Sequence, residues 1–550
     1  MKNITITFTN GENILVESGI LALDALKNHL PSNRQVLAVK INNEICSLTT
    51  QIDINATIEP VFSGTREGSA IYRRSLCFLL AAAARKCFSE SRLLVGHSLG
   101  YGYYYTVEKE EPLTQNDIDL LKKEISNIIK QNLPIYTDVI SYNDAVNLFK
   151  DAYQIQTYKQ LFFNCPSKLT INTMDNFSDL YYGPLVPSSG YINIFDIKLY
   201  GEGFLLRFPS TAEPDKLSDF EDIPQLFNVY SRYKKWGKQI GVTSTADLNE
   251  LIQHRSVGSF IDIAETFQQK CIADIADMIH KRGNVRVILI AGPSSSGKTT
   301  TSKKLSLQLR AIGYQPKVIE LDSYYVDRTK TPKDSDGNYD YECLEALDVA
   351  QLNQDLIDLF DGKEVQIPSY NFSEGQRYYN GHSIKLEAED LLILEGIHGL
   401  NDKLTPLVPN EYKFKIYLSA LTQLNLDDHN RIPTSDNRLI RRIVRDSRFR
   451  GKTAAETIAM WNSVQRGERL HIFPFQNNAD AMLNTALDYE LPVLKVYAEP
   501  LLKCVKPTEK EFSEAARLLR FLENFSPIPA NNVPGKSIIR EFIGGSEFKY

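Results

Sequence analysis

The residues that most clearly predict chemistry form a glycine-rich loop, Gly292-Pro-Ser-Ser-Ser-Gly297-Lys298-Thr299. The loop matches G-x-x-x-x-G-K-[ST], in which glycines let successive backbone N–H groups point at phosphate oxygens. The lysine of this pattern reaches the β- and γ-phosphates of a nucleoside triphosphate, and the hydroxyl that follows binds Mg²⁺. The residues that we expect to bind the phosphates of ATP are Gly292, Ser294, Ser295, Ser296, Gly297, Lys298, Thr299 and Thr300.

Two acidic residues follow apolar runs that are expected to be strands. Asp322 comes directly after the run 317–321, and Glu395 comes directly after the run 391–394. Carboxylates at the C-terminal ends of parallel strands lie beside the crevice that holds the phosphate loop. There Asp322 can accept the proton of an attacking hydroxyl, and Glu395 can act as a partner of Mg²⁺. A helix cap or a turn is the alternative role of Asp322, and for an isolated aspartate it is the more common one.

An arginine-rich segment lies further along the chain. Arg438, Arg441, Arg442 and Arg445 recur at helical spacing and share one face of a predicted helix. Such a helix is typical of a lid that closes on phosphates and neutralises the charge of a phosphoryl-transfer transition state. The alternative is a basic helix that is simply exposed to solvent.

The elements around these residues alternate between strand and helix. The runs 285–291, 317–321 and 391–394 are predominantly apolar, as strands covered on both faces are. Helical patterns over 300–312 and 349–360 separate these runs. The predicted fold class is therefore an α/β P-loop domain, with a parallel sheet flanked by helices.

The front of the chain is expected to contain α+β domains. It has a hairpin signal at Asn10-Gly11, an Ala-rich helical pattern over 69–86, and a helix that begins at the N-cap Thr114. We predict five units along the chain: 1–63, 64–200, 201–284, 285–505 and 506–550. The unit 201–284 is a connecting region, and 506–550 is a C-terminal helix and tail.

The stretch 230–238 of the connecting region interleaves aromatic and basic residues. Such a pattern can bind RNA through charge and stacking, but a solvated surface segment is the more common explanation.

Composition narrows the function classes. The 550 residues include 62 Lys and Arg against 68 Asp and Glu, and a net charge of −6 argues against a protein that coats nucleic acid. No apolar run approaches the roughly 20 residues of a membrane span, and the N-terminus has no signal-peptide pattern. The 7 cysteines are scattered, which favours reduced thiols. We therefore expect a cytoplasmic protein without membrane contact, and oligomerisation is left open.

Several motifs together resemble the uridine kinase and phosphoribulokinase group of P-loop kinases. Besides the phosphate loop they are Asp322-Ser-Tyr-Tyr325, Ile367-Pro-Ser-Tyr-Asn-Phe372, Leu394-Glu-Gly396 and the segment 438–451. The resemblance implies transfer of the ATP γ-phosphoryl group to a hydroxyl, which in uridine kinases is the ribose 5′-OH. It makes Asp322 the base, keeps Lys298 on the phosphates, and has Thr299 and Glu395 bind Mg²⁺. It also implies that Arg445 and Arg450 act from the lid, and that Glu342, Tyr370 and Arg442 contact the nucleoside.

Two departures from this family pattern concern the acceptor. Glu342-Cys-Leu-Glu-Ala346 stands where uridine kinases usually have Asp-His-Pro-Asp-Ala, and Glu342 is one methylene longer. Within Ser373-Glu-Gly-Gln-Arg377, Gly375 stands about where the family has a histidine that reads the pyrimidine. A missing donor removes discrimination that a buried hydrogen bond would supply. Another small hydroxyl substrate, such as a sugar phosphate, is the alternative acceptor.

The front half resembles other proteins. Residues 1–63 look like a TGS domain, and 64–200 look like the second domain of threonyl-tRNA synthetase, whose editing site has two histidine-containing pairs. The corresponding positions here are Arg74, Phe78, Tyr181 and Leu185. These side chains cannot perform the same chemistry, so we expect editing to be absent. The region would then be a binding or regulatory module. A nucleotide-binding regulator that contacts tRNA or the ribosome is the competing function, and the nearby His97 is expected to be structural.

Overall fold

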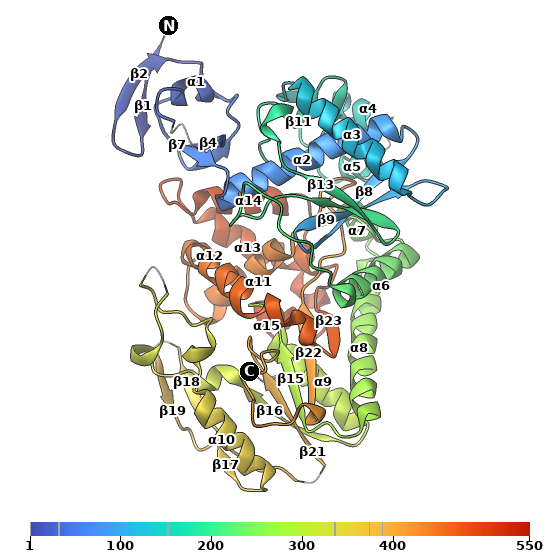
Figure 1. Cartoon of the computed structure of the whole chain (residues 1–550), viewed down its shortest axis with the longest axis vertical. Coiled ribbons are helices and arrows are strands. Elements are labelled where there is room, and N and C mark those ends of the chain that lie inside the picture. The colour runs from blue at the N-terminus through green and yellow to red at the C-terminus, as the bar shows by residue number, and fades with distance from the viewer. Residues whose placement is uncertain are drawn as a thin grey trace.

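A computed structural model describes residues 2–30, 34–150, 154–334, 337–372, 374–387 and 389–549. The small N-terminal sheet stands at one end of the molecule (Figure 1), and the C-terminal parallel sheet with its helices forms the other end. Antiparallel sheets and helices lie between these two ends.

The first sheet is small and mixed, with strand order β2-β1-β7-β4-β5. Its elements are β1 (Asn3–Phe8), β2 (Asn13–Glu17), β4 (Val36–Ile41), β5 (Glu44–Cys46) and β7 (Ala56–Phe62), with β3 (Ile20–Leu21), β6 (Gln51–Ile52) and α1 (Ala22–Leu26) beside it. β1 and β2 pair antiparallel, so the predicted hairpin at Asn10-Gly11 is confirmed. Gly11 has a φ of +85°, which a residue without Cβ adopts at no steric cost.

The next part packs two long helices against an antiparallel sheet with strand order β13-β14-β9-β8. The sheet consists of β8 (Arg92–Leu99), β9 (Gly102–Glu108), β13 (Asp196–Tyr200) and β14 (Gly203–Arg207), and the helices are α2 (Arg66–Cys87) and α3 (Gln115–Gln131). A smaller sheet and two short helices complete this part, namely β10 (Tyr136–Ser141), β11 (Lys168–Met174), β12 (Phe177–Asp179), α4 (Tyr142–Lys150) and α5 (Ile155–Gln160). Thr114 and Asp117 form a capping box at the start of α3, as the sequence predicts.

Three helices connect this part to the C-terminal sheet: α6 (Pro224–Ile240), α7 (Thr245–Gln253) and α8 (Val257–Arg282). The aromatic and basic stretch 230–238 lies within α6. Tyr230 and Tyr233 are buried, and Trp236 stacks on Phe267 with ring centroids 4.6 Å apart. The suggestion that these rings stack on RNA bases is therefore wrong, because packing inside the protein already covers them.

The C-terminal sheet is parallel throughout, with strand order β16-β21-β15-β22-β23. Its strands are β15 (Val287–Ala291), β16 (Gln315–Glu320), β21 (Asp390–Glu395), β22 (Lys413–Ser419) and β23 (Ala481–Asn484). The predicted α/β class and three of the strands are confirmed. The two further strands, β22 and β23, are not evident in the sequence pattern, because Lys413 and Lys415 interrupt the apolar run of β22. Both lysines are nonetheless buried: Lys413 donates to the Thr405 carbonyl at 2.8 Å, and Lys415 pairs with Asp402.

The helices around this sheet, besides α8, are α9 (Lys298–Ala311), α10 (Val349–Phe360), α11 (Thr434–Phe449), α12 (Ala454–His471), α13 (Glu490–Lys503), α14 (Phe512–Leu522) and α15 (Arg540–Ile543). Helices α8 and α9 cover one face of this sheet and α10 covers the other, whereas α11 to α15 pack mainly against one another. Two small hairpins join β17 (Val365–Gln366) to β20 (Ser383–Ile384) and β18 (Ser369–Asn371) to β19 (Gln376–Tyr378). Among the described residues, every helix is too short or too polar to cross a lipid bilayer.

Candidate active site

The glycine-rich loop joins the buried strand β15 to the helix α9. Ser295 and Gly297 adopt left-handed backbone angles, with φ of +59° and +81°. A Cβ on Gly292 would lie 2.5 Å from the backbone oxygen of Leu418, so only glycine fits at this close approach to β22. The strand, loop and helix that the phosphate-binding pattern requires are all present.

Lys298 turns back toward its own loop. Its Nζ donates to the carbonyls of Gly292 and Pro293 at 3.2 and 3.4 Å. The ammonium group therefore lies over the mouth of the loop, next to the backbone that would surround a phosphate chain.

Thr299 and Glu395 meet beside the loop, because β15 and β21 are neighbouring strands. The Thr299 hydroxyl donates to Oε1 of Glu395 at 2.6 Å. Burial, assisted by the nearby carboxylates of Glu320 and Asp322, raises the pKa of Glu395 to about 8, although Lys298 and Thr299 oppose the rise. A buried carboxylate and a hydroxyl are oxygen ligands that suit Mg²⁺, which usually takes one or two protein ligands and completes its shell with phosphates and water.

Asp322 lies on the short helical turn η2 (Leu321–Tyr324), directly after β16. Because β16 and β21 are neighbours in the sheet, this carboxylate is at the same strand ends as Glu395. It is close enough to raise the pKa of both Glu395 and Glu320. Asp322 and Glu395 thus lie together at the strand ends beside the loop, where a carboxylate can take a proton from a substrate hydroxyl.

The arginines at the start of α11 lie against the phosphate loop and not in solvent. Arg438 donates to the Ser294 carbonyl and Arg441 to the Ser295 carbonyl, both at 3.1 Å. Arg438 is paired with Glu468 and Arg441 with Glu490, and all four side chains are at most 4% exposed. The alternative of a solvated basic helix is therefore wrong. These two arginines hold the loop backbone in place.

The remaining arginines converge on Asp446, a residue that the sequence analysis did not single out. Arg445 pairs with Asp446 at 2.8 Å, Arg442 at 3.3 Å and Arg450 at 3.7 Å. Burial favours the neutral acid, but the three guanidinium groups outweigh it and lower the pKa of Asp446. Arg442 also donates to the Ser294 hydroxyl at 2.7 Å, which ties the group to the loop.

The residues expected to bind the acceptor lie near the same strand ends. Glu342 packs against Gly467, where a Cβ would lie 2.3 Å from the Cβ of Glu342. Burial and Glu468 raise the pKa of Glu342 to about 7, while Arg442 and Lys298 oppose the rise. Tyr370 joins an aromatic cluster, with its ring centroid 5.5 Å from that of Tyr325.

Arg328 packs against Gly375, the residue at which the sequence analysis expects the family's histidine to be missing. A Cβ on Gly375 would lie 2.5 Å from Nε of Arg328. The Arg328 guanidinium donates to the Tyr341 hydroxyl at 3.1 Å and to the Phe372 carbonyl at 2.9 Å. The sequence analysis missed Arg328 because it is far from Gly375 in the chain. Ser373, the first residue of that segment, is outside the described residues.

The four positions of the former editing pattern do lie together in the front half. Phe78 and Tyr181 are in edge contact with ring centroids 5.8 Å apart, Leu185 is buried, and Arg74 donates to the Pro184 carbonyl at 3.0 Å. No histidine or cysteine is present at these four positions.

A loop from the C-terminal half reaches this region, and we call residues 425–431 the docking loop. Asp428 pairs with Arg92 at 2.6 Å, and Nδ1 of His429 lies 2.7 Å from Oδ2 of Asp179. The Val95 N–H donates to the Asp428 carbonyl at 3.0 Å. The docking loop lies just before α11. The front half therefore contacts the chain close to the arginines that hydrogen-bond to the phosphate loop.

His97 is buried near this contact. Its ring stacks on Tyr230 at 5.9 Å, and burial together with Arg431 lowers its pKa to about 3. A neutral, packed ring agrees with the structural role that the sequence analysis assigned to it.

Comparison with known proteins finds different relatives for the two halves of the chain. Residues 287–491 match the model of the Phosphoribulokinase / Uridine kinase family. This segment is a P-loop kinase domain of that family. The N-terminal region is distantly similar to threonine–tRNA ligases, for example that of Oleidesulfovibrio alaskensis, which is 30% identical over 42% of this chain and 38% of the ligase. The ligase of Desulforamulus reducens is 32% identical over 38% of this chain and 35% of its own length. The chain thus spans well under half the length of these curated relatives.

Two solved structures show weaker similarity. A possible uridine kinase from Bacillus stearothermophilus is 19% identical, with 39% of this chain and 98% of that chain covered and a TM-score of 0.27. A D-glycerate 3-kinase from Cryptococcus neoformans is 13% identical, with 48% and 89% covered and a TM-score of 0.21.

Proposed function

We propose that the protein transfers the γ-phosphoryl group of ATP to the hydroxyl of a small acceptor, with a nucleoside 5′-OH as the first candidate. The observation that carries the proposal is that Lys298, Thr299, Glu395 and Asp322 lie together beside the phosphate loop. A phosphate-binding loop alone would serve a nucleotide sensor equally well. A proton acceptor beside it is needed only for transfer to a hydroxyl.

In the proposed reaction, the loop N–H groups and Lys298 bind the phosphates and hold the γ-phosphorus in line with the acceptor. The acceptor oxygen bonds to the γ-phosphorus while the bond to the β,γ-bridging oxygen breaks, and ADP leaves. The hydroxyl proton goes to Asp322. Thr299 and Glu395 would hold Mg²⁺, which when bound offsets phosphate charge. Arg445 and Arg450 lie on the lid side, where their charge stabilises the equatorial oxygens.

The acceptor is the open question, and Arg328 supports a second candidate. A guanidinium group offers five donors and no acceptor, which matches phosphate or carboxylate better than it matches a pyrimidine edge. Because Arg328 fills the space above Gly375, next to Tyr341 and Phe372, a sugar phosphate or another anionic acceptor is the alternative to a nucleoside.

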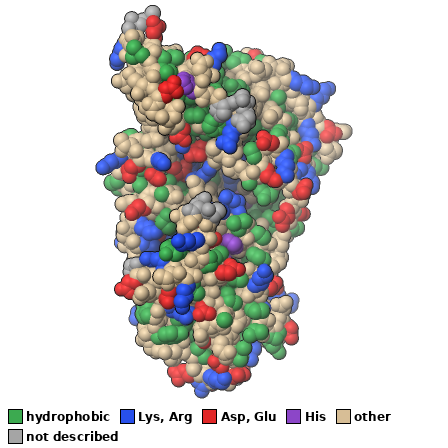
Figure 2. All heavy atoms as spheres, turned by 60° about the vertical axis from the view of Figure 1, so that its left-hand side comes forward, with side chains coloured by type: hydrophobic (Ala, Val, Ile, Leu, Met, Phe, Trp, Pro, Cys, Tyr) green, Lys and Arg blue, Asp and Glu red, His purple; other side chains and the backbone are tan. Residues whose placement is uncertain are grey.

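For the front half we propose a supporting role. The docking loop makes a buried ion pair and backbone hydrogen bonds with it, next to the helix that holds the phosphate loop. The competing function is a regulator that senses tRNA or the ribosome. On the face drawn in Figure 2, basic and acidic side chains are interspersed, which gives a nucleic acid little continuous positive surface.

The test is ADP release from Mg-ATP over a panel of nucleosides, sugars and sugar phosphates. Lys298→Ala removes the loop cation and should abolish stimulated release, whereas Lys270→Ala, at an exposed lysine of α8, should leave it unchanged. Stimulation by nucleosides supports the first candidate, and stimulation only by phosphorylated acceptors supports the second. If nothing stimulates release and RNA co-purifies, as judged by the 260 to 280 nm absorbance ratio, the regulator replaces the kinase.

A further inference from the structure

The C-terminal tail of the chain returns to the phosphate loop. In Figure 1 the C-terminus lies among the elements of the parallel sheet, near β15 and β16. Ile538, Ile539 and Phe542 are fully buried and belong to the same apolar cluster as α11 and α13. The segment 537–543 is therefore folded against the kinase domain.

The tail touches the loop at its last glycine. A Cβ on Gly297 would lie 2.6 Å from Cγ2 of Ile538, so the isoleucine side chain packs directly against that backbone. The Phe542 ring lies 5.0 Å from the guanidinium of Arg441, which in turn donates to the Ser295 carbonyl. Both contacts place the tail beside the residues that shape the loop.

An acidic residue of the tail also occupies phosphate-binding donors. Oε2 of Glu541 accepts hydrogen bonds from the Thr300 backbone N–H at 3.1 Å and from the Thr300 hydroxyl at 2.6 Å. Thr300 is in the first turn of α9, where free N–H groups and the helix dipole attract anions. The carboxylate of Glu541 thus sits where a phosphate oxygen of a bound nucleotide would be expected.

Hydrogen bonds hold the part of the tail that precedes Glu541. Arg540 donates to the Val533 and Ala530 carbonyls at 2.6 and 2.8 Å, and the Ser537 hydroxyl lies 3.2 Å from that of Tyr489. Gly544 and Gly545 follow with φ of +80° and +70°, left-handed angles that glycine adopts without steric cost.

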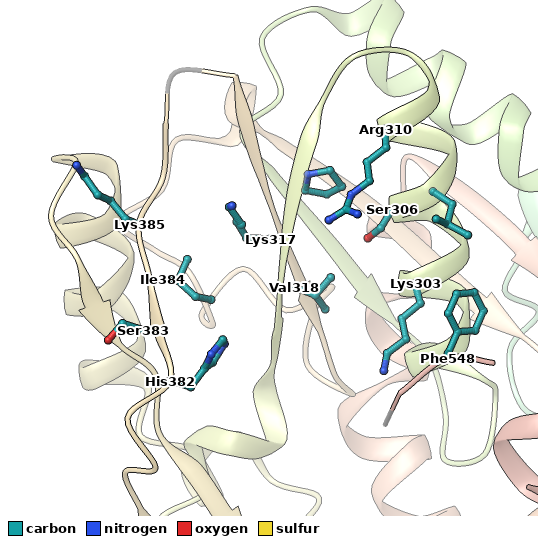
Figure 3. Close-up of a pocket in the computed structure, with 12 residues that line it drawn as sticks. Lys303, Ser306, Arg310, Lys317, Val318, His382, Ser383, Ile384, Lys385 and Phe548 are labelled. Carbon is teal, nitrogen blue, oxygen red and sulfur yellow. The ribbon is translucent and has the colours of Figure 1, made fainter. Parts of the chain in front are cut away.

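The last residues run along a groove beside α9. Phe548 lines this groove of about 510 Å³ together with Lys303 and Arg310 of α9 (Figure 3), and Lys303 donates to the Lys549 carbonyl.

We propose that residues 537–543 are an internal competitor of ATP, with the phosphate loop as their docking surface. This inference rests on the proposed function, because it assumes that the loop binds ATP. Two anions cannot share the Thr300 donors, so nucleotide binding requires Glu541 to leave. The apolar anchors Ile538 and Phe542 keep the tail close, so release is confined to the turn α15 and reverses when the nucleotide departs.

The experiment compares binding of a fluorescent ATP analogue to the full chain and to Glu541→Gln. Glu547→Gln is the matched control, because Glu547 is an exposed tail carboxylate whose ion pair with Lys536 is long, 4.0 Å. We expect Glu541→Gln to bind the ATP analogue with a Kd about tenfold lower than that of the wild type. The reason is that the competing carboxylate loses its charge, and with it a charge-assisted hydrogen bond to Thr300. Glu547→Gln should match the wild type. An unchanged or higher Kd for Glu541→Gln overturns the proposal.

Hydrogen exchange supplies a second readout that does not depend on turnover. Mg-ATP should speed exchange of the amides of 541–543, whereas slower exchange would make the tail part of the nucleotide site and overturn the competition. Equal binding of ATP by both chains refutes the tail proposal alone and leaves the kinase proposal standing. If the folded wild type and the folded Glu541→Gln both fail to bind ATP, the proposed function fails as well.

Discussion

The contact between His429 and Asp179 offers the sharpest test of how the two halves of the chain are joined. The two side chains are 8% and 1% exposed, and the His429 Nδ1 to Asp179 Oδ2 distance is 2.7 Å. Asp179→Asn would leave a buried imidazolium without its charge partner. Breaking a buried pair in this way costs about 3 to 5 kcal/mol.

The pKa of His429 gives an independent value for the free energy with which this pair stabilises the contact. Burial lowers the pKa of His429, but Asp179 and the neighbouring Asp428 and Asp427 outweigh it and raise the value from 6.5 to about 9. A shift of this size corresponds to about 3 kcal/mol of stabilisation. Because the folded-state pKa is the higher one, this stabilisation is complete below about pH 6.5 and is lost as the pH rises through about 9.

Asp427 also makes the stability of this contact depend on pH, but over a different pH range. Burial and Asp179 raise its pKa from 3.8 to about 7, so its ionisation destabilises the contact between about pH 4 and pH 7 and adds no slope above that range. The interval from pH 7 to pH 9 therefore isolates His429.

Hydrogen exchange of the docking loop, corrected for the intrinsic rate at each pH, measures the opening of this contact directly. In the wild type, the opening free energy should fall by about 3 kcal/mol from pH 7 to above pH 9, which is roughly a hundredfold faster exchange. In the Asp179→Asn variant, the amides of the docking loop should exchange at this fast rate at every pH. His254→Ala, at the exposed histidine that follows α7, should behave as the wild type. A pH-independent opening energy in the wild type would refute the reasoning.

Three further predictions concern the candidate active site. Asp322→Asn should lower kcat for the best acceptor by about 10² to 10⁴ while the Kd of ATP stays within about twofold, as separate turnover and titration measurements would reveal. Glu395→Gln should raise the Mg²⁺ concentration needed for half-maximal turnover. In the wild type that concentration should fall as the pH rises toward about 8, because the carboxylate must lose its proton to bind the ion. Asp446→Asn should release Arg445 and Arg450 and lower kcat more than it raises the KM of ATP, which steady-state kinetics would show.

The sequence predicts local features of the site well because each depends on adjacent residues. The phosphate loop, the strand before it and the helix after it are all encoded within Val285 to Ile312, and all three form as expected. The capping box at Thr114 is similarly local. The strand ends place Asp322 and Glu395 together because parallel neighbours end at one edge of a sheet.

The features that sequence reasoning missed depend on contacts between distant residues. Arg328 fills the space at Gly375, and Glu541 accepts a hydrogen bond from Thr300 although the two residues are far apart in the sequence. Neither spacing nor composition links these pairs. A buried lysine such as Lys413 is missed for a related reason, because its carbonyl partner, on Thr405, is supplied by a turn outside the strand.

The arginine helix shows how a local pattern can be right about position and incomplete about role. Helical spacing predicts that Arg438, Arg441 and Arg442 share one face, and all three contact the phosphate loop. However, Arg438 and Arg441 each pair with a separate buried carboxylate, Glu468 and Glu490, and leaving either one uncompensated is costly. Asp446 differs, because three arginines share it and two stay when one leaves. Arg438 and Arg441 are therefore fixed supports of the loop, and any closing movement is left to the residues that share Asp446. Because the docking loop lies just before this helix, one continuous segment of chain joins the contact at His429 to the arginines that hold the phosphate loop.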